Sequence, residues 1–396
     1  MIHAHQRQFE RPRRLAAVLA LLLAGAAAVR ADEPTPAPVE VVHYRDGGAE
    51  RSITGRILAE DTDGGVMVQT PDGVQHLVEA AMVVSRERLE APFTPLTPDQ
   101  LAQRVLSELP EGFNTHTTPH YVVCYNTSRA YAQWTSSLLE RLHRAFTNYW
   151  ENQGVEIHEP EFPLVVVIYA SADQYRAASA DELGTAAGSI IGYYSLTTNR
   201  VNMYDLTGSE ALRGANGGRG SLRDINRMLA QPAAIPLVAT VVHEATHQIA
   251  FNCGLQQRLA ELPLWLVEGM AVYFEAPDLS STRGWRGIGK VNHLRLSTFK
   301  KNLYTPRRAS LLSMIADDKR FRDARTAADA YADAWALNYF LIRYHPDEYV
   351  AYVKAQAKKK PLIPVSPETR IEEFREHFGD IEKLDREFVK RMGRVN

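Results

Sequence analysis

The segment from Leu237 to Asn252 constrains the fold of this chain more than any other. It is long enough for about four helical turns and is largely apolar, yet its centre reads His-Glu-Ala-Thr-His. Pro236 suits the first turn of a helix, and Gly254 suits the position beyond its C-terminus. Polar side chains in such a helix are costly to bury unless partners satisfy them. The sequence therefore predicts a buried helix whose polar residues meet a specific partner.

Two histidines lie on one face of this predicted helix. Positions 243 and 247 are separated by slightly more than one turn, so their imidazoles project in nearly the same direction. Two imidazoles placed in this way can bind one tetrahedral Zn²⁺ ion. Glu244 follows the first histidine, where its carboxylate can hold a water molecule without binding the metal. We expect His243 and His247 to be metal ligands and Glu244 to be a catalytic base.

A third ligand is expected in the apolar run from Leu262 to Phe274. Glu268 is the only charged residue in this run, Pro263 can begin a helix there, and Gly269 allows another backbone to pack closely. A single carboxylate on an apolar helix must be paired, protonated or metal-bound. We expect Glu268 to complete the Zn²⁺ site. The alternative is a structural role, in which Glu268 accepts hydrogen bonds from a neighbouring helix.

These two motifs together resemble those of a known group of enzymes. His-Glu-Ala-Thr-His, followed about twenty residues later by Trp-Leu-Val-Glu-Gly-Met-Ala, resembles the gluzincin zinc metallopeptidases. More narrowly, the chain is similar to the bacterial peptidase-MA-like family, from about Thr115 to the C-terminus. The resemblance implies that His243, His247 and Glu268 bind Zn²⁺ and that Glu244 is the general base. It also implies a thermolysin-like α+β domain with a mixed sheet and a helical C-terminal part, but it fixes no substrate.

Tyr331 is the candidate for stabilising the oxyanion. Gluzincins commonly provide a Tyr or His for this purpose, and Tyr331 begins a helical segment downstream of Glu268. Its distance from Glu268 is similar to that of the catalytic tyrosine in the aminopeptidase branch of the gluzincins. The alternative is ordinary packing, because Tyr331 shares a helical stripe with three further residues, Trp335, Asn338 and Ile342.

The sequence assigns other residues around the site less sharply. Tyr193 and Tyr194 are weaker candidates, because they lie in a predicted hairpin whose edge strand can pair with an extended peptide. A metal-binding imidazole normally donates its second nitrogen to a carboxylate or a carbonyl. Three acidic residues are possible acceptors, and the sequence does not rank them: Asp205, Glu275 and Asp333.

The N-terminus has the pattern of a signal peptide, residues 1–31. Residues 1–14 are basic, Leu15 to Val29 is an uncharged apolar run, and Val29-Arg30-Ala31 is a small-x-small cleavage site. The apolar run is shorter than the roughly 20 residues needed to span a bilayer, although an uncleaved anchor remains the alternative. We therefore expect an exported protein that is periplasmic, attached to the cell surface or secreted.

The remainder of the chain divides into two predicted domains. Residues 32–38 are a proline-rich linker, and residues 91–98 hold three prolines and form a second linker. Between them, residues 39–90 predict a small all-β SH3-like barrel whose partner is unknown. Its five short strands are separated by glycine-containing turns: Val39–Tyr44, Ser52–Glu60, Gly65–Thr70, Gln75–Val78 and Met82–Ser85.

Residues 99–396 predict the α+β metallopeptidase domain. Tyr121–Tyr125 and Leu164–Tyr169 are apolar strands, and Ser128–Trp150 between them is an amphipathic helix. Ile190–Tyr194 and Arg200–Tyr204 form a hairpin. After Pro236 the pattern is mainly helical to the end of the chain.

Composition excludes several classes of function. The 396 residues have a formal net charge of −2, and no strongly basic face is expected, so nucleic acid is not an expected partner. Two cysteines exclude a disulfide scaffold, and Cys124 and Cys253 either pair or remain buried thiols. No apolar stretch after the signal peptide approaches membrane-spanning length, so no stable membrane span is expected.

The sequence thus predicts an exported Zn²⁺ metallopeptidase that hydrolyses a peptide or protein substrate. Endopeptidase activity is favoured, because no Gly-x-Met-Glu-Asn-type element for holding a substrate amine precedes the zinc helix. One alternative is an inactive or autoinhibited peptidase-like binding or scaffold protein, which the small barrel and the glycine-rich segment 207–221 suggest. Another is a zinc hydrolase of a non-peptide amide or ester, because metal-activated water does not choose the acyl substrate.

Overall fold

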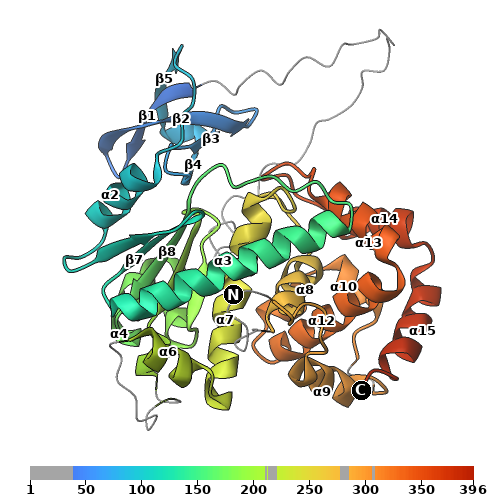
Figure 1. Ribbon diagram of the computed structural model, residues 1–396. Coiled ribbons are helices and arrows are strands. Elements are labelled where there is room, and N and C mark those ends of the chain that lie inside the picture. Colours follow the sequence, from blue (N-terminus) through green and yellow to red (C-terminus); the bar gives the residue numbers. More distant parts are fainter. Residues whose placement is uncertain (1–38, 210–211, 213–220, 277–284, 306–307) are drawn as a thin grey trace. The chain divides into compact units, whose positions relative to one another are not determined.

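The computed structural model describes residues 39–209, 212, 221–276, 285–305 and 308–396 (Figure 1). Contacts divide the chain into two compact units, one ending at Thr97 and the other running from Pro98 to Asn396. This boundary falls within the segment 91–98 that the composition indicates as a linker. The predicted signal peptide, the first linker and most of the glycine-rich segment 207–221 lie outside the described residues.

The first unit is an antiparallel sheet of five strands in the order β4-β3-β2-β1-β5. The strands are β1 (Val39–Asp46), β2 (Ala49–Glu60), β3 (Val66–Gln69), β4 (Gln75–Val78) and β5 (Val83–Leu89). Every predicted strand is present, and β4 has the predicted bounds. β1 and β5 end later than expected, β2 begins three residues earlier, and β3 is shorter by one residue at each end. Alternate apolar residues of the sheet form its small core: Val42, Val66, Val68 and Val78.

The prediction of a closed barrel in this unit is not confirmed. Within residues 39–97, β4 pairs only with β3 and β5 pairs only with β1, so these two strands are the edges of an open sheet. The physical reason lies in the connection between the two strands. A short 3₁₀ turn, Ala80–Met82, leads the chain from β4 to the far side of β1 rather than back to β3.

The second unit is built on a mixed five-stranded sheet in the order β6-β7-β8-β10-β9. Its strands are β6 (Asn114–Thr117), β7 (Tyr121–Tyr125), β8 (Leu164–Tyr169), β9 (Gly192–Tyr194) and β10 (Arg200–Tyr204). The central pairs β7–β8 and β8–β10 are parallel, and the outer pairs β6–β7 and β9–β10 are antiparallel. The predicted hairpin is confirmed, and it makes β9 an edge strand of the sheet.

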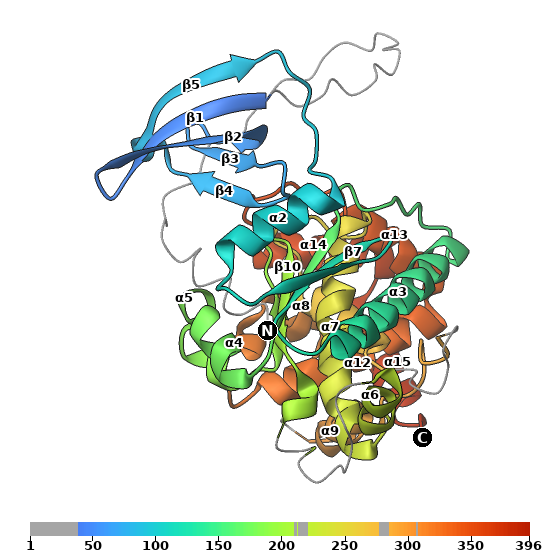
Figure 2. The same ribbon diagram turned by 60° about the vertical axis from the view of Figure 1, so that its left-hand side comes forward.

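Helices surround this sheet and then continue to the C-terminus, which confirms the predicted α+β class. Helix α7 lies between the sheet and the C-terminal helices, and α4 lies on the other side of the sheet from α3 and α7 (Figures 1 and 2). The helices are α2 (Pro98–Glu108), α3 (Arg129–Asn152), α4 (Ala172–Ala178), α5 (Ala180–Leu183), α6 (Leu222–Leu229), α7 (Ile235–Asn252), α8 (Leu264–Phe274), α9 (His293–Asn302), α10 (Leu311–Ala316), α11 (Lys319–Arg322), α12 (Ala327–Tyr344), α13 (Pro346–Gln356), α14 (Pro367–Phe378) and α15 (Ile381–Met392).

No single helix in the described ranges is long and apolar enough to cross a membrane. Two consecutive helical segments, Leu222–Leu229 and Pro232–Asn252, are together long and apolar enough, although the chain bends sharply between them.

Helix α7 ends at Asn252 as the sequence predicts, and it begins at Ile235, two residues before the predicted segment. Pro236 occupies its first turn, and Gly254, just beyond the C-cap, has a φ of +90°, a conformation that side chains with a Cβ rarely adopt. The buried Gln248 fixes the helix on the sheet, because its Nε2 donates to the backbone oxygens of Val165 and Asn199 at 2.9 Å. A polar anchor of this kind sets the rotation of α7 and therefore the direction of its histidines.

Helix α8 packs so closely on α12 that only glycine fits at one position of the contact. A Cβ built on Gly269 would lie 2.5 Å from the backbone oxygen of Ala334 and 2.0 Å from Nδ2 of Asn338. Asn338 links the two helices, because its Nδ2 donates to the backbone oxygen of Trp265 at 2.8 Å. The prediction that Gly269 permits close backbone packing is confirmed, and its partner is α12.

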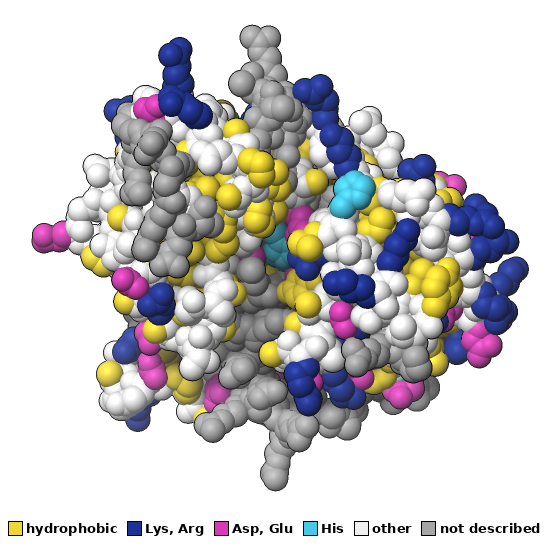
Figure 3. Space-filling view, turned by 90° about the horizontal axis from the view of Figure 1, so that it is seen from below, with side chains coloured by type: hydrophobic (Ala, Val, Ile, Leu, Met, Phe, Trp, Pro, Cys, Tyr) yellow, Lys and Arg dark blue, Asp and Glu magenta, His cyan; other side chains and the backbone are white. Residues whose placement is uncertain are grey.

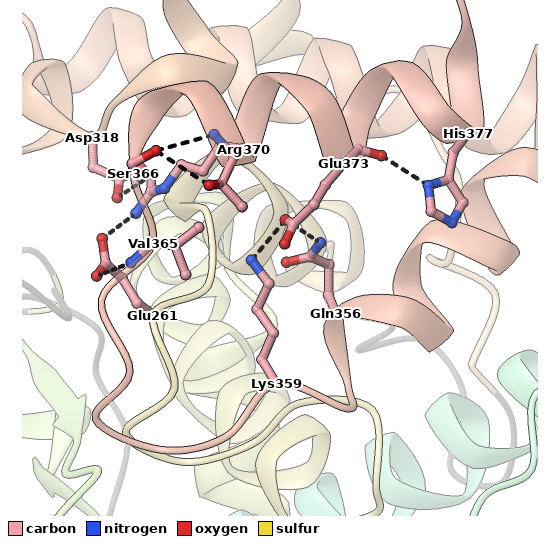
Figure 4. A network of polar contacts seen from close by, with 10 residues as sticks. Glu261, Asp318, Gln356, Lys359, Val365, Ser366, Arg370, Glu373 and His377 are labelled. Carbon is pink, nitrogen blue, oxygen red and sulfur yellow. Dashed lines mark hydrogen bonds and ion pairs between the residues drawn. The ribbon is translucent and has the colours of Figure 1, made fainter. Parts of the chain in front are cut away.

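The start of α8 is held by a buried arginine from α14 (Figure 4). Arg370 donates to Asp318 Oδ2 and to Glu261 Oε1, both at 2.8 Å. The second oxygen of Asp318 accepts from the backbone N–H of Leu264 at 2.9 Å, at the first residue of α8. This network ties three separate chain segments together and fixes the helix that carries Glu268.

Both cysteines are buried free thiols, which decides between the two alternatives that the sequence leaves open. Burial raises the pKa of Cys124 and of Cys253 to about 12, so both remain protonated at neutral pH.

Candidate metal centre

The three predicted ligands meet at one point between α7 and α8. His243 Nε2 lies 3.1 Å from His247 Nε2 and 3.1 Å from Glu268 Oε2. His247 Nε2 lies 3.5 Å from the same Glu268 oxygen, which closes a triangle of three donor atoms. The two histidines are one turn apart on α7, and Glu268 faces them from the middle of α8. Residues separated by more than twenty positions in the sequence therefore form one site.

The size of this triangle fits a zinc ion. Zinc binds imidazole nitrogen and carboxylate oxygen at about 2.0–2.2 Å, so two donors in a tetrahedral shell lie about 3.3–3.6 Å apart. The observed separations of 3.1–3.5 Å are close to that range. Glu268 is fully buried, and its Oε1 has no hydrogen-bond partner among the described residues. The donor types and this unpaired buried oxygen both suit a cation in the site.

Glu244 lies beside the three donors and is fixed by the sheet. Its Oε2 accepts a hydrogen bond from the backbone N–H of Tyr194 at 2.9 Å, so the edge strand β9 orients the carboxylate. Its Oε1 is buried and has no partner among the described residues. One oxygen is thus held in place while the other remains able to accept a proton.

Of the three acidic candidates, Glu275 is the one that lies beside a predicted metal ligand, His243. Its Oε2 lies 3.4 Å from Nδ1 of His243, and its Oε1 accepts from Asn292 Nδ2 at 2.8 Å. The two other candidates are paired elsewhere. Asp205 accepts from Thr207, and Asp333 pairs with Arg320. Of the three acceptors that the sequence could not rank, Glu275 is therefore the one at the site.

The electrostatic environment of His243 favours a positive charge. Burial by itself would lower the pKa of His243, but the carboxylates of Glu268 and Glu275 raise it to about 9. Burial would likewise raise the pKa of Glu275, but His243 and Arg295 hold it below its usual value. A pocket with several buried carboxylates and two imidazoles attracts a cation, either a proton or a metal ion.

Replacing Glu275 by Gln should weaken zinc binding about 10- to 100-fold, because the carboxylate that orients and polarises His243 becomes neutral. A competition titration against a chromophoric chelator measures this change. Glu372→Gln, on an exposed position of α14, is the matched control and should leave the affinity unchanged. An unaltered zinc affinity in Glu275→Gln would show that Glu275 does not support the ligand.

Tyr331 lies near the three donors, in the second turn of α12 rather than at its first residue. Its ring centroid is 6.3 Å from that of His243. Burial raises the pKa of the Tyr331 phenol, and the charges of Glu268 and Glu244 raise it further, so the phenol keeps its proton. Of the rest of the stripe, Trp335 and Asn338 are fully buried and serve packing, whereas Ile342 is partly exposed. Tyr331 is also partly exposed, and it is the member of the stripe whose ring lies beside His243.

Tyr193 and Tyr194 use their hydroxyl groups away from the donors. Tyr193 donates to Glu182 at 2.7 Å, and Tyr194 donates to Asn199 at 2.7 Å. The contribution of Tyr194 to the site is its backbone N–H, which the side-chain pattern did not indicate.

Arg295 is a residue near the site that sequence reasoning missed. Its guanidinium lies 5.5 Å from the ring centroid of Tyr331, and its Nε lies 3.5 Å from Glu275 Oε1. It belongs to α9, a short helix with an ordinary polar pattern, so no sequence signal distinguishes it from other surface arginines.

The surface is hollowed near the middle of one face of the molecule. Figure 3 shows histidine and acidic side chains at the bottom of this hollow, with hydrophobic side chains around it. His243 is only 5% exposed and His247 only 1%, so access to the donor atoms is narrow.

Comparison with known proteins gives one family match. Residues 237–363 match a family model described as "Protein of unknown function (DUF1570)". The matched region runs from α7 past the end of α13, and it contains all three donors together with Glu244, Glu275 and Tyr331. The sheet and Tyr194 lie outside it. No curated protein matches the chain.

Proposed function

We propose that this chain is a zinc metallopeptidase of gluzincin type. The observation that carries the proposal is the triangle of His243, His247 and Glu268, with Glu244 directly beside it. Three protein donors leave a fourth position of a tetrahedral shell for water or substrate, as in catalytic zinc sites.

A zinc ion held by these three residues would polarise the scissile carbonyl and acidify a water molecule. Glu244 Oε1 then accepts the proton of the attacking water and passes it to the leaving amine. The backbone N–H of Tyr194 keeps the other Glu244 oxygen in place during both transfers. The protonated phenol of Tyr331 donates a hydrogen bond to the oxyanion that forms on the carbonyl carbon.

A peptide substrate suits the position of the edge strand. Strand β9 pairs only with β10 among the described strands, and its Tyr194 N–H is directed at Glu244. An extended peptide that lies along this edge would place its backbone beside the proton acceptor. We further propose a thermolysin-like arrangement for this unit, supported by the mixed sheet against α7 and by the glutamate ligand on α8.

The same proposal places the mature protein outside the cytoplasm, after cleavage behind Ala31. The first unit would then be an SH3-like module that binds or braces a partner. Its strand order and antiparallel pairing support this proposal.

A peptide-library cleavage assay on the zinc-loaded chain starting at Asp32 tests the proposed function. The expected result is cleavage that stops when a chelator removes the metal and returns when Zn²⁺ is added. A zinc-loaded protein that cleaves no peptide contradicts the proposal and favours a binding or scaffold protein. Metal-dependent cleavage of only esters or other amides would identify a different zinc hydrolase.

A further inference from the structure

A second group of possible metal ligands lies away from the site described above and shares no residue with it. His120 lies just before β7, His143 is on α3, and Glu159 belongs to the segment that leads to β8. Each offers one ligand atom within 4.8 Å of the others. His120 Nε2 lies 3.2 Å from Glu159 Oε2, and the two imidazole rings are stacked with centroids 4.0 Å apart.

The orientation of His120 is fixed by a partly buried hydrogen-bond network. Glu140 Oε2 lies 2.7 Å from Nδ1 of His120, and Glu140 Oε1 accepts from the backbone N–H of His120 at 2.9 Å. Thr118 donates to the same Glu140 oxygen at 2.7 Å. Because a carboxylate only accepts, Nδ1 of His120 carries a proton, and Nε2, which faces Glu159 Oε2, is the nitrogen that can coordinate. Histidines that bind metals are typically held by a carboxylate in this way.

His143 supplies an independent indication of a ligand. Its side chain is only 3% exposed, and its Nε2 has no hydrogen-bond partner among the described residues. Buried polar atoms in folded proteins are normally satisfied, so an unpaired imidazole nitrogen next to a second imidazole requires an explanation.

An imidazolium at His120 between Glu140 and Glu159 would account for the two carboxylate contacts without a metal. It would leave the buried nitrogen of His143 unpaired, and it would place a positive charge against the stacked ring of His143. A divalent ion would satisfy all three side chains once the ring of His143 turns out of the stack, because each imidazole binds a metal in its own ring plane. Two imidazoles and a carboxylate are a common ligand set for zinc.

We propose that His120, His143 and Glu159 form a second site for a divalent transition-metal ion such as Zn²⁺. The side chain of Glu159 is 79% exposed, so the site opens to solvent and exchanges its ion readily. The bound ion would join the start of β7, helix α3 and the segment before β8, which are shown in Figure 1.

Calorimetric titration of the metal-free mature chain with Zn²⁺ tests the proposal. The wild type should bind two ions per chain, and Glu159→Gln should lose one of them or weaken its binding at least about tenfold. Glu156→Gln, at an exposed position three residues earlier, is the matched control and should still bind two. A stoichiometry that Glu159→Gln does not change, with no change in either affinity, would overturn the proposal.

A variant of the first site separates this test from the proposed function. Glu268→Ala should retain the second ion, and zinc should still raise its melting temperature. Adding Glu159→Gln to Glu268→Ala should abolish both the remaining binding and the thermal shift. If Glu268→Ala binds no zinc, the second site is refuted while the first stands. If Glu268→Ala binds as many ions as the wild type and only Glu159→Gln binds fewer, the second site stands and the first fails.

Discussion

Glu244→Gln should bind zinc like the wild type and hydrolyse peptides about 10²- to 10⁴-fold more slowly. Glutamine has nearly the same size as glutamate. Its amide oxygen can still accept the hydrogen bond from the backbone N–H of Tyr194. It cannot accept the proton of the attacking water, because an amide is not a base at neutral pH. Turnover of a library-selected peptide, measured together with zinc content, checks both parts of this expectation.

The control for this result is Glu372→Gln, which removes the same charge from an exposed position of α14. Its turnover and its zinc content should equal those of the wild type. Retention of near-normal turnover in Glu244→Gln would mean that another group is the general base. Loss of zinc in Glu244→Gln would mean that Glu244 itself belongs to the metal shell.

Gly269→Ala should lower the free energy of unfolding by about 1–3 kcal/mol, and by more if the helices cannot separate. The new methyl group would lie 2.5 Å from the backbone oxygen of Ala334, which cannot move without shifting α12. Because Glu268 is the preceding residue, displacement of α8 should also weaken zinc binding. Chemical denaturation with and without zinc measures both effects.

Gly188→Ala is the matched control for the glycine substitution. A Cβ at this position would meet only the flexible side chain of Arg176, at 3.7 Å, so little change in unfolding free energy is expected. Equal stability of Gly269→Ala and Gly188→Ala would show that α8 and α12 are not packed as closely as described.

The sequence predicted the fold best where apolar runs had a clear period. Strands β7, β8 and β10 have the predicted bounds. β7 and β8 are short continuous apolar runs of strand length rich in β-branched residues, and in β10 apolar residues alternate with polar ones. Strand β6 was missed, because Asn114–Thr117 is a polar edge with no such signal. The open edge of the first sheet was not foreseen either, since closure depends on pairing between distant strands rather than on any local pattern.

The candidate site was predictable to the extent that its chemistry lies on regular helices. The fixed geometry of a helix places His243, Glu244 and His247 together, and the isolated charge of Glu268 in an apolar run marks it as unusual. The role of Tyr194 was not predictable in this way, because its backbone N–H rather than its side chain contacts Glu244. Glu275 was one of three equal candidates, since only the turn after α8 brings it to His243.

The group formed by His120, His143 and Glu159 carried no sequence signal. Its members lie on three different segments with irregular spacing, and single histidines in such segments are usually packing or surface residues. Their proximity follows from the parallel pairing of β7 with β8 and from the packing of α3 on β7.

An anomalous difference map recorded at the zinc absorption edge, on crystals of the zinc-loaded chain starting at Asp32, tests the central claim most directly. The expected result is a strong peak bonded to Nε2 of His243, Nε2 of His247 and a carboxylate oxygen of Glu268. The absence of a peak between these three side chains, in protein shown to contain zinc, would contradict the proposed metal centre.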